Sequence, residues 1–232
     1  RRENTSKRRK KIISQMKVTQ NKKQKNQLIL SNLIMAKAYL GYSRSMWDPT
    51  IFPYLSGIRD QFCIFDLDQT TCMIKKSVKF ISKVHYLNGK ILFVGFPEAD
   101  KKDLLKLCTL KSHSYISDQS WINGILTNGH SLFLYRKTFL NSFKLKNEKE
   151  KRLFYEKFGG ILNLNRKPDL LVIYNHSKSL DALYEAIKLN IPVVSFINSG
   201  NNPEKVDYPI TGNFMSKNGG KIYSNLIKYL LN

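Results

Sequence analysis

The chain has 232 residues, 42% of them apolar, which is enough for one α/β domain of ordinary size plus a short extension. No stretch approaches the roughly 20 consecutive apolar residues that a membrane-spanning helix needs, so we expect a soluble protein without membrane contacts. Lysine and arginine number 39 against 17 acidic residues, and the net charge of +22 is typical of a protein that binds a polyanion such as nucleic acid.

The first 26 residues are a basic segment with little apolar content. They carry eleven lysines and arginines against the single Glu3, a net charge of +10. We expect this segment to be disordered unless bound, and we interpret it as an arm that lies along nucleic-acid phosphates. A solubilising or targeting role stays open, and a chain that begins at Arg1 is compatible with a longer precursor. The candidate phosphate-binding residues are Arg1, Arg2, Lys7, Arg8, Arg9, Lys10 and Lys11.

Residues 27–232 are expected to form a single domain, whose first third contains two helices and a hairpin. Apolar residues from Leu28 to Ala38 predict a helix that ends near Gly41. Residues 50–58 and 61–66 predict two extended segments, joined by a turn at 57–60. Asp68 is the expected N-cap of a second helix, which runs to about Leu87 and stops at Asn88-Gly89.

The remainder alternates between short apolar strands and amphipathic helices. Strands are predicted at 90–94, 114–116, 170–174 and 192–197, and helices at 98–110, 179–189 and 218–231. This alternation predicts a parallel sheet of roughly five strands that is covered on both faces, which is a three-layer α/β/α sandwich. The charged sequence at about 131–160 predicts a short helical hairpin inserted into that body.

Cysteine and histidine offer neither a disulfide framework nor a metal site. The cysteines are odd in number and widely spaced, at Cys63, Cys72 and Cys108. The histidines lack metal-ligand spacing, at His85, His113, His130 and His176. We therefore expect a reducing compartment and no metal or other cofactor.

One motif suggests an enzyme. The apolar strand at 63–65 is followed by Asp66-Leu67-Asp68-Gln69-Thr70, which resembles the nucleophile motif of haloacid-dehalogenase-type phosphatases. That resemblance implies Asp66 as nucleophile and Asp68 as acid/base beside Mg²⁺. The chain has no later pair of adjacent aspartates to complete such a site, and Gln69 replaces the usual glycine. We therefore interpret Asp66 and Asp68 as strand-end and N-cap residues, and keep the magnesium-dependent phosphatase as the alternative.

A second resemblance covers residues from about 35 to 230. Its motifs are Tyr39-Leu40-Gly41-Tyr42, Trp47-Asp48-Pro49, Gly57-Ile58-Arg59, Trp121-Ile122-Asn123-Gly124-Ile125-Leu126-Thr127-Asn128, and the run N-P-x-x-V-D-Y-x-I-x-G-N from Asn202 to Asn213. In this order they resemble the universal small-subunit ribosomal protein two family in its bacterial form. The chain departs from the family in Tyr39 and Tyr42, which replace two histidines, and in a shorter helical hairpin.

The resemblance implies a flavodoxin-like strand order and a structural, non-catalytic role in the small ribosomal subunit. The implied partners are small-subunit rRNA and neighbouring ribosomal proteins, with no small-molecule substrate and no homo-oligomer. Besides the basic segment, the candidate rRNA-binding residues are Arg44, Arg59, Lys101 and Lys102. We expect them to contact phosphates rather than bases.

The motifs are expected to serve the fold as well. Trp47 and Trp121 are interpreted as packing anchors, and Asp207-Tyr208-Pro209 as part of a shaped loop. The basic segment, the short hairpin and the Asn-, Lys- and Ile-rich loops favour an organellar ribosome, specifically a mitochondrial one. A plastid or the bacterial cytoplasm are the alternatives.

Overall fold

The computed structural model describes residues 26–117, 121, 123–128, 147–149, 164 and 166–231. The basic segment therefore lies outside the described residues except for Asn26. The predicted helical hairpin at 131–160 also lies outside them, except for residues 147–149.

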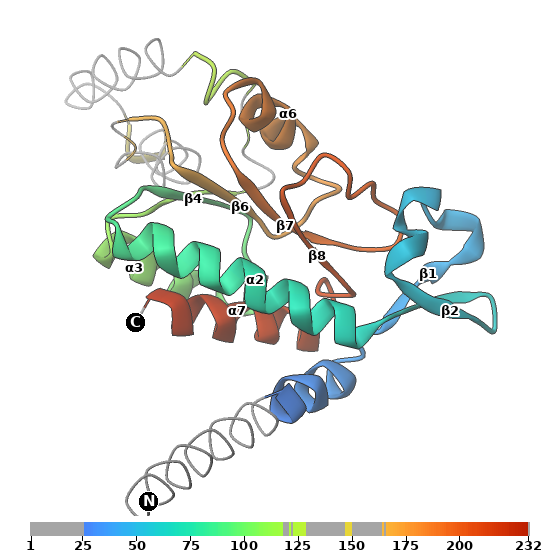
Figure 1. Cartoon of the computed structure of the whole chain (residues 1–232). Helices are drawn as coiled ribbons and strands as arrows, with labels where there is room; N and C mark the ends of the chain where they lie inside the picture. Colours follow the sequence, from blue (N-terminus) through green and yellow to red (C-terminus); the bar gives the residue numbers. More distant parts are fainter. Residues whose placement is uncertain are drawn as a thin grey trace, which may run out of the picture.

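A five-stranded parallel sheet forms the centre of the molecule (Figure 1). Its strands are β4 (Ile91–Val94), β5 (Ser114–Ile116), β6 (Leu170–Ile173), β7 (Val193–Ile197) and β8 (Tyr208–Thr211). They are ordered β5-β4-β6-β7-β8, and every neighbouring pair is parallel. Numbered from β4 onward this is the order 2-1-3-4-5, which is that of flavodoxin-like folds. The predicted sheet and strand order are confirmed.

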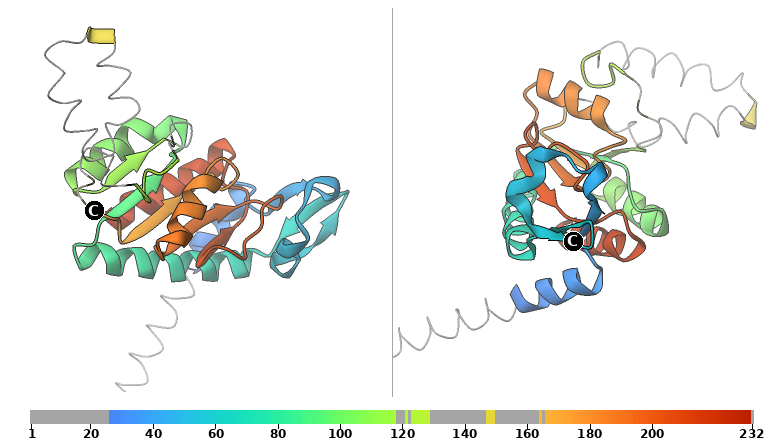
Figure 2. Two further views of the ribbon diagram at one scale, coloured as in Figure 1. Left: turned by 90° about the horizontal axis from the view of Figure 1, so that it is seen from above. Right: turned by 90° about the vertical axis from the view of Figure 1, so that its right-hand side faces the viewer.

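Helices cover both faces of this sheet. The long helix α2 (Leu67–Tyr86), α3 (Lys101–Leu110) with the preceding turn η3 (Glu98–Asp100), and α7 (Lys217–Leu231) lie on one face. Helix α6 (Leu180–Lys188) lies on the other, as Figures 1 and 2 show. The predicted three-layer α/β/α architecture is thus confirmed.

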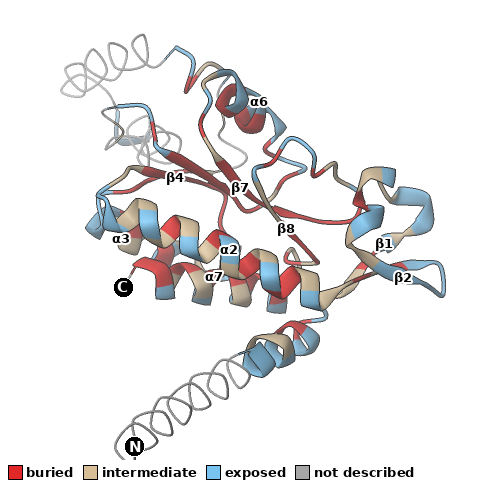
Figure 3. Cartoon of the chain, viewed as in Figure 1, coloured by how far each residue is buried: buried red, intermediate tan, exposed pale blue. Residues whose placement is uncertain are grey.

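Alternate side chains of the strands enter two separate cores. Ile91 and Phe93 of β4 join the core beneath α2, α3 and α7, whereas Leu92 and Val94 join the core beneath α6. This division follows from the two-residue period of a strand. Because both faces are covered, every residue of β4 to β7 is buried (Figure 3).

Both tryptophans belong to the core beneath α6. Trp47 and Trp121 are half-buried and pack against that core, which includes the fully buried Leu171 and Ile173. Their prediction as packing anchors is confirmed.

A second, antiparallel sheet projects from one end of the parallel sheet. It consists of β1 (Leu40–Ser43), β2 (Leu55–Arg59) and β3 (Phe62–Phe65) in the order β1-β3-β2. The predicted hairpin is confirmed, but its turn is at Asp60 and Gln61 rather than at 57–60. Both residues have positive φ, at 48° and 67°, as a tight two-residue hairpin requires. Strand β1 was not predicted.

The expectation of an extended segment at 50–58 was wrong in its first half. Residues Pro49–Tyr54 form a 3₁₀ helix, η2, which follows another short turn, η1 (Arg44–Met46). Asp48 caps η2, because its Oδ1 accepts a hydrogen bond from the Thr50 N–H at 2.9 Å, and Pro49 occupies its first position. Extended structure begins only at Leu55.

Two further predictions were misplaced. The first helix spans residues 26–35 and is followed by a turn at 36–39, where Lys37 has a φ of 54°. The segment Asp207-Tyr208-Pro209 is not wholly a loop, because Tyr208 and Pro209 begin β8. Strand β8 is at the sheet edge and pairs only with β7, a position where the missing N–H of Pro209 is tolerated.

Candidate nucleic-acid interface

The carboxyl edge of the parallel sheet is where α/β enzymes bind their ligands, and here protein covers the part of that edge that follows β7. Ser199, which follows β7, is fully buried. Its Oγ accepts a hydrogen bond from the Tyr42 N–H at 2.7 Å, and its carbonyl accepts one from the Asp48 N–H at 2.8 Å. A Cβ on Gly41 would lie 2.8 Å from that Oγ, so the close approach of β1 requires glycine. The segment 41–48 thus occupies this part of the edge.

Two residues of the phosphatase-like motif, Asp66 and Thr70, have structural roles. Asp66 is the N-cap of α2, because its Oδ1 accepts hydrogen bonds from the N–H groups of Asp68 and Gln69 at 2.9 and 3.4 Å. The expected cap, Asp68, instead lies exposed in the first turn. The buried Thr70 hydroxyl is within hydrogen-bonding distance of the Asp66 and Thr211 carbonyls.

The strand before this motif also differs from that of a phosphatase. Such enzymes need their aspartates at the carboxyl end of a parallel strand, and β3 belongs to the antiparallel sheet. No group of three His, Cys, Asp or Glu residues in the described part of the chain could hold a metal ion.

Two of the predicted site residues lie close together on the antiparallel sheet. Arg59 and Ser43 both pair with Phe62, from opposite sides, and the Arg44 N–H donates a 2.7 Å hydrogen bond to the Gln61 carbonyl. Both arginine side chains are exposed. Arg59 forms a 3.8 Å ion pair with Asp60, but at this exposure the pair adds little stability. The structure therefore presents two cations near the hairpin turn.

Lys101 and Lys102 lie at the start of α3, a helix that is well separated from the antiparallel sheet (Figure 1). Asp100 and Asp103 flank them, and both carboxylates also approach Lys228 of α7, at 3.7 and 3.8 Å. These acidic neighbours reduce the local positive potential. The other candidates, Arg1, Arg2, Lys7, Arg8, Arg9, Lys10 and Lys11, lie outside the described residues.

Sequence reasoning missed a row of lysines on α2. Lys76, Lys79 and Lys83 are exposed and spaced by three and four residues, so they lie along one stripe of the helix. The only acidic residue in α2 is Asp68, in the first turn. The spacing was visible in the sequence, but which stripe of α2 stays uncovered depends on the packing of α7 and the sheet.

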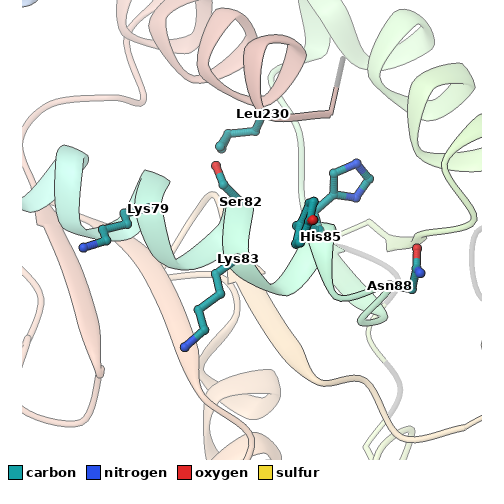
Figure 4. A pocket seen from close by; sticks show the side chains of 7 residues that line it. Lys79, Ser82, Lys83, His85, Asn88 and Leu230 are labelled. Atoms are coloured by element: carbon teal, nitrogen blue, oxygen red, sulfur yellow. The ribbon is translucent and has the colours of Figure 1, made fainter.

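A shallow cavity of about 670 Å³ adjoins this row of lysines. Lys79 and Lys83 line it together with Ser82, His85 and Asn88 of the same region, and Leu230 of α7. Figure 4 shows Ser82 pointing toward Leu230, while both lysines extend away from α7. This end of α2 therefore combines cations with neutral hydrogen-bonding groups, a mixture suited to phosphate and sugar oxygens.

Two of the histidines meet below this surface. The Nδ1 of His85 and the Nε2 of His113 are 2.9 Å apart, and the Ile91 N–H points at His113 Nδ1 at 3.4 Å. Because that Nδ1 accepts, the proton of neutral His113 is on Nε2 and is donated to His85. Burial, followed by the charges of His85, Lys90 and Lys111, lowers the pKa of His113 to about 4. His113 is therefore neutral at physiological pH.

The run from Asn202 to Asn213 shapes the sheet edge rather than an exposed site. The Asp207 carboxylate accepts a 2.8 Å hydrogen bond from the Val193 N–H at the start of β7. Val206 enters the core beneath α6 and Ile210 the core beneath α2. The Asn213 N–H donates to the Ala38 carbonyl at 2.9 Å, which joins this run to the turn after the first helix.

None of the helices in the described part of the chain has both the length and the apolar character needed to cross a membrane.

Comparison with known proteins agrees with the resemblance of the motifs. The family model described as Ribosomal protein S2 matches residues 33–229. The chain is 32% identical over 213 residues to the small ribosomal subunit protein uS2 of Rickettsia prowazekii (strain Madrid E), covering 85% of this chain and 72% of that protein. It is 32% identical over 210 residues to the uS2 of Rickettsia peacockii (strain Rustic), covering 84% and 71%. For the uS2 of Rickettsia canadensis (strain McKiel) the identity is 31% over 220 residues, covering 85% and 72%.

Proposed function

The chain belongs to the ribosomal protein S2 family, and we propose on this basis that it is a structural constituent of the small ribosomal subunit, where it binds rRNA and neighbouring proteins. The observation that carries the proposal is the family match over residues 33–229, nearly the whole described fold. Its role in translation is structural rather than catalytic. The capping role of Asp66 also removes the residue on which the phosphatase alternative depended.

For rRNA we propose three contact surfaces. The first is Arg44 with Arg59 on the antiparallel sheet, and the second is the row Lys76, Lys79 and Lys83 on α2. The third is the basic segment 1–26, which we propose is an extension added to the 27–232 domain. These cations are suited to phosphates, whose contacts position a protein without reading bases. Lys101 and Lys102 remain weaker candidates because Asp100 and Asp103 flank them.

We further propose that this ribosome is mitochondrial. The support is in the sequence: the highly basic first 26 residues lie outside the family match, and the hairpin region is short. The relatives named above are bacterial, which fits the bacterial alternative. Fractionation of the source cells, with the tagged chain followed by immunoblotting, decides between these compartments. Recovery with a mitochondrial marker supports the proposal, and recovery with bacterial or plastid ribosomes contradicts it.

The structural role is tested by sedimentation. The tagged full-length chain should move with the small subunit in a sucrose gradient at low salt, and it should be stoichiometric with other small-subunit proteins in purified particles. Sedimentation only at the top of the gradient would contradict the proposal.

A further inference from the structure

An apolar groove lies between the helix of residues 26–35, α2 and α7. Its volume is about 720 Å³. Two large apolar side chains at its margin, Met35 and Tyr229, are each 79% exposed. Its remaining apolar lining includes Ile29, Val78, Ile222 and Leu226. Exposed apolar side chains that adjoin one another, as they do along this groove, are typical of a surface that a partner covers.

The charged residues of this groove all have the same sign. Lys75 and Lys79 of α2 and Lys221 of α7 line it, and neither aspartate nor glutamate is among its described lining residues. Lys75 donates a 2.5 Å hydrogen bond to the Asn26 side chain, which joins α2 to the first helix. The groove therefore offers an apolar floor with a cationic rim.

This charge argues against two occupants. The chain's own residues 1–25 are adjacent in sequence, but with eleven basic residues they would repel the lysines. An RNA strand would suit the lysines, but its bases bind by stacking on aromatic rings, and Tyr229 is the sole aromatic residue among the described lining residues. The aliphatic floor would then remain uncovered.

We propose that this groove binds an amphipathic helix of a neighbouring small-subunit protein, with apolar residues on one face and acidic residues beside them. An amphipathic helix that lays its apolar face into a groove is a common mode of protein recognition. The groove runs along α7 from Asn218 to Tyr229, which at 1.5 Å per residue is about 16 Å, or about three helical turns. The inference rests on the proposed function, since it places the partner in the same particle.

The test is site-specific photocrosslinking in intact small subunits. Met35 is replaced by p-benzoylphenylalanine in the full-length chain, the assembled subunits are purified and irradiated, and the crosslinked species is identified by mass spectrometry. Leu110, which is 82% exposed at the end of α3 and outside the groove, carries the same probe as the matched control. We expect the Met35 probe to crosslink to a protein segment with acidic residues and a helical apolar spacing, at a yield above that of the control.

The charge of the rim is tested with a pair of variants. In Lys75→Glu/Lys221→Glu the Met35 crosslink should fall about tenfold, because like charges oppose the acidic partner, while Lys75→Arg/Lys221→Arg should retain it. The proposal is overturned if the probe crosslinks to rRNA, to residues 1–25 or to a segment without acidic residues, or if its yield does not exceed the control. If the unsubstituted chain fails to sediment with the subunit, the proposed function fails as well. If the unsubstituted chain sediments with the subunit but the crosslink is one of these contradicting outcomes, the inference about the groove fails and the proposed function stands.

Discussion

The carboxylate of Glu185 on α6 accepts a hydrogen bond from the indole N–H of Trp121 at 3.2 Å, across 64 residues of sequence. The same carboxylate accepts the backbone N–H groups of Gly124, Leu126 and Thr127 at 2.7, 2.8 and 3.3 Å. One buried side chain thus holds the described residues of the tryptophan-containing family motif against the sheet. Its negative charge is stabilised by the four donors, which would otherwise have to be satisfied by water.

Replacement of Glu185 should therefore destabilise the fold. Glu185→Ala leaves four donors unpaired, and we expect a loss of about 3 kcal/mol in the free energy of unfolding. Glu185→Gln should cost about half as much, because its amide keeps one oxygen acceptor but places an NH₂ group near the other donors. Urea unfolding followed by tryptophan fluorescence measures both, with the exposed Glu204→Gln as the matched control. Equal stability of all three variants would contradict this role.

The two interpretations of Asp66, as an N-cap and as a nucleophile, predict different effects of substitution on stability and activity. As an N-cap, Asp66→Asn should retain stability, because asparagine caps equally well, whereas Asp66→Ala should lose about 1 kcal/mol. Asp68→Ala should have a smaller effect, since its side chain lies exposed in the first turn. If Asp66 were instead a nucleophile, the substitution Asp66→Asn would abolish hydrolysis of p-nitrophenyl phosphate in the presence of Mg²⁺. We expect no such activity in the wild type, and activity that disappears in this variant would restore the phosphatase interpretation.

Removal of the α2 lysines should weaken rRNA binding and its dependence on salt. Each lysine that contacts a phosphate releases a counterion, so Lys79→Gln/Lys83→Gln should lower the affinity and reduce the slope of log K against log salt by about one to two. The control is Lys178→Gln/Lys188→Gln, which removes two exposed lysines from the α6 side. Filter binding to small-subunit rRNA across a salt series provides the measurement. An unchanged slope would show that these lysines do not contact phosphate.

Acidification should destabilise the protein through His113. The unfolded state takes up a proton near pH 6.5, while the folded state, with a pKa of about 4, does not. This contribution leaves the stability unchanged above pH 6.5 and lowers it between pH 6.5 and about 4, by up to about 3 kcal/mol.

The matched variant for this titration is His113→Gln. It should be less stable than the wild type at neutral pH, because the hydrogen bond to His85 is altered, but its stability should fall less steeply toward pH 4. Chemical denaturation at intervals between pH 7.5 and 4 compares the two slopes. If the free energy of unfolding fell equally steeply with pH in both proteins, His113 would not be the cause of the pH dependence.

Deletion of residues 1–26 should reduce incorporation into the small subunit and leave the α/β body folded. The segment carries a net charge of +10, whereas the described cores are built from residues beyond it. Circular dichroism checks the fold, and gradient sedimentation checks the incorporation. Normal assembly of the truncated chain would contradict the proposed role of the extension.

The order and type of most elements could be predicted from the amino-acid sequence, because apolar periodicity and turn residues act locally. The strands at 91–94, 114–116, 170–173 and 193–197 and the helices α3, α6 and α7 all coincide closely with their predictions. The end of α2 at Asn88-Gly89 was also predictable, because it depends on local backbone geometry. Asn88 has a φ of 55°, and the Gly89 N–H donates a 2.9 Å hydrogen bond to the Val84 carbonyl. The order of the strands in the sheet was predicted from the family resemblance, because the spacing of strands and helices along the chain does not specify it.

Which residues contact one another across the chain could not be predicted from the sequence and is seen only in the folded structure. Strand β1 forms because β3 supplies its hydrogen bonds, and Tyr208-Pro209 becomes a strand because β7 lies beside it. The partners of Glu185, the contact of His85 with His113 and the exposed lysine row on α2 likewise depend on residues distant in sequence. Such contacts carry no local periodic signal, since hydrogen bonding and burial are set by the packing of the whole fold.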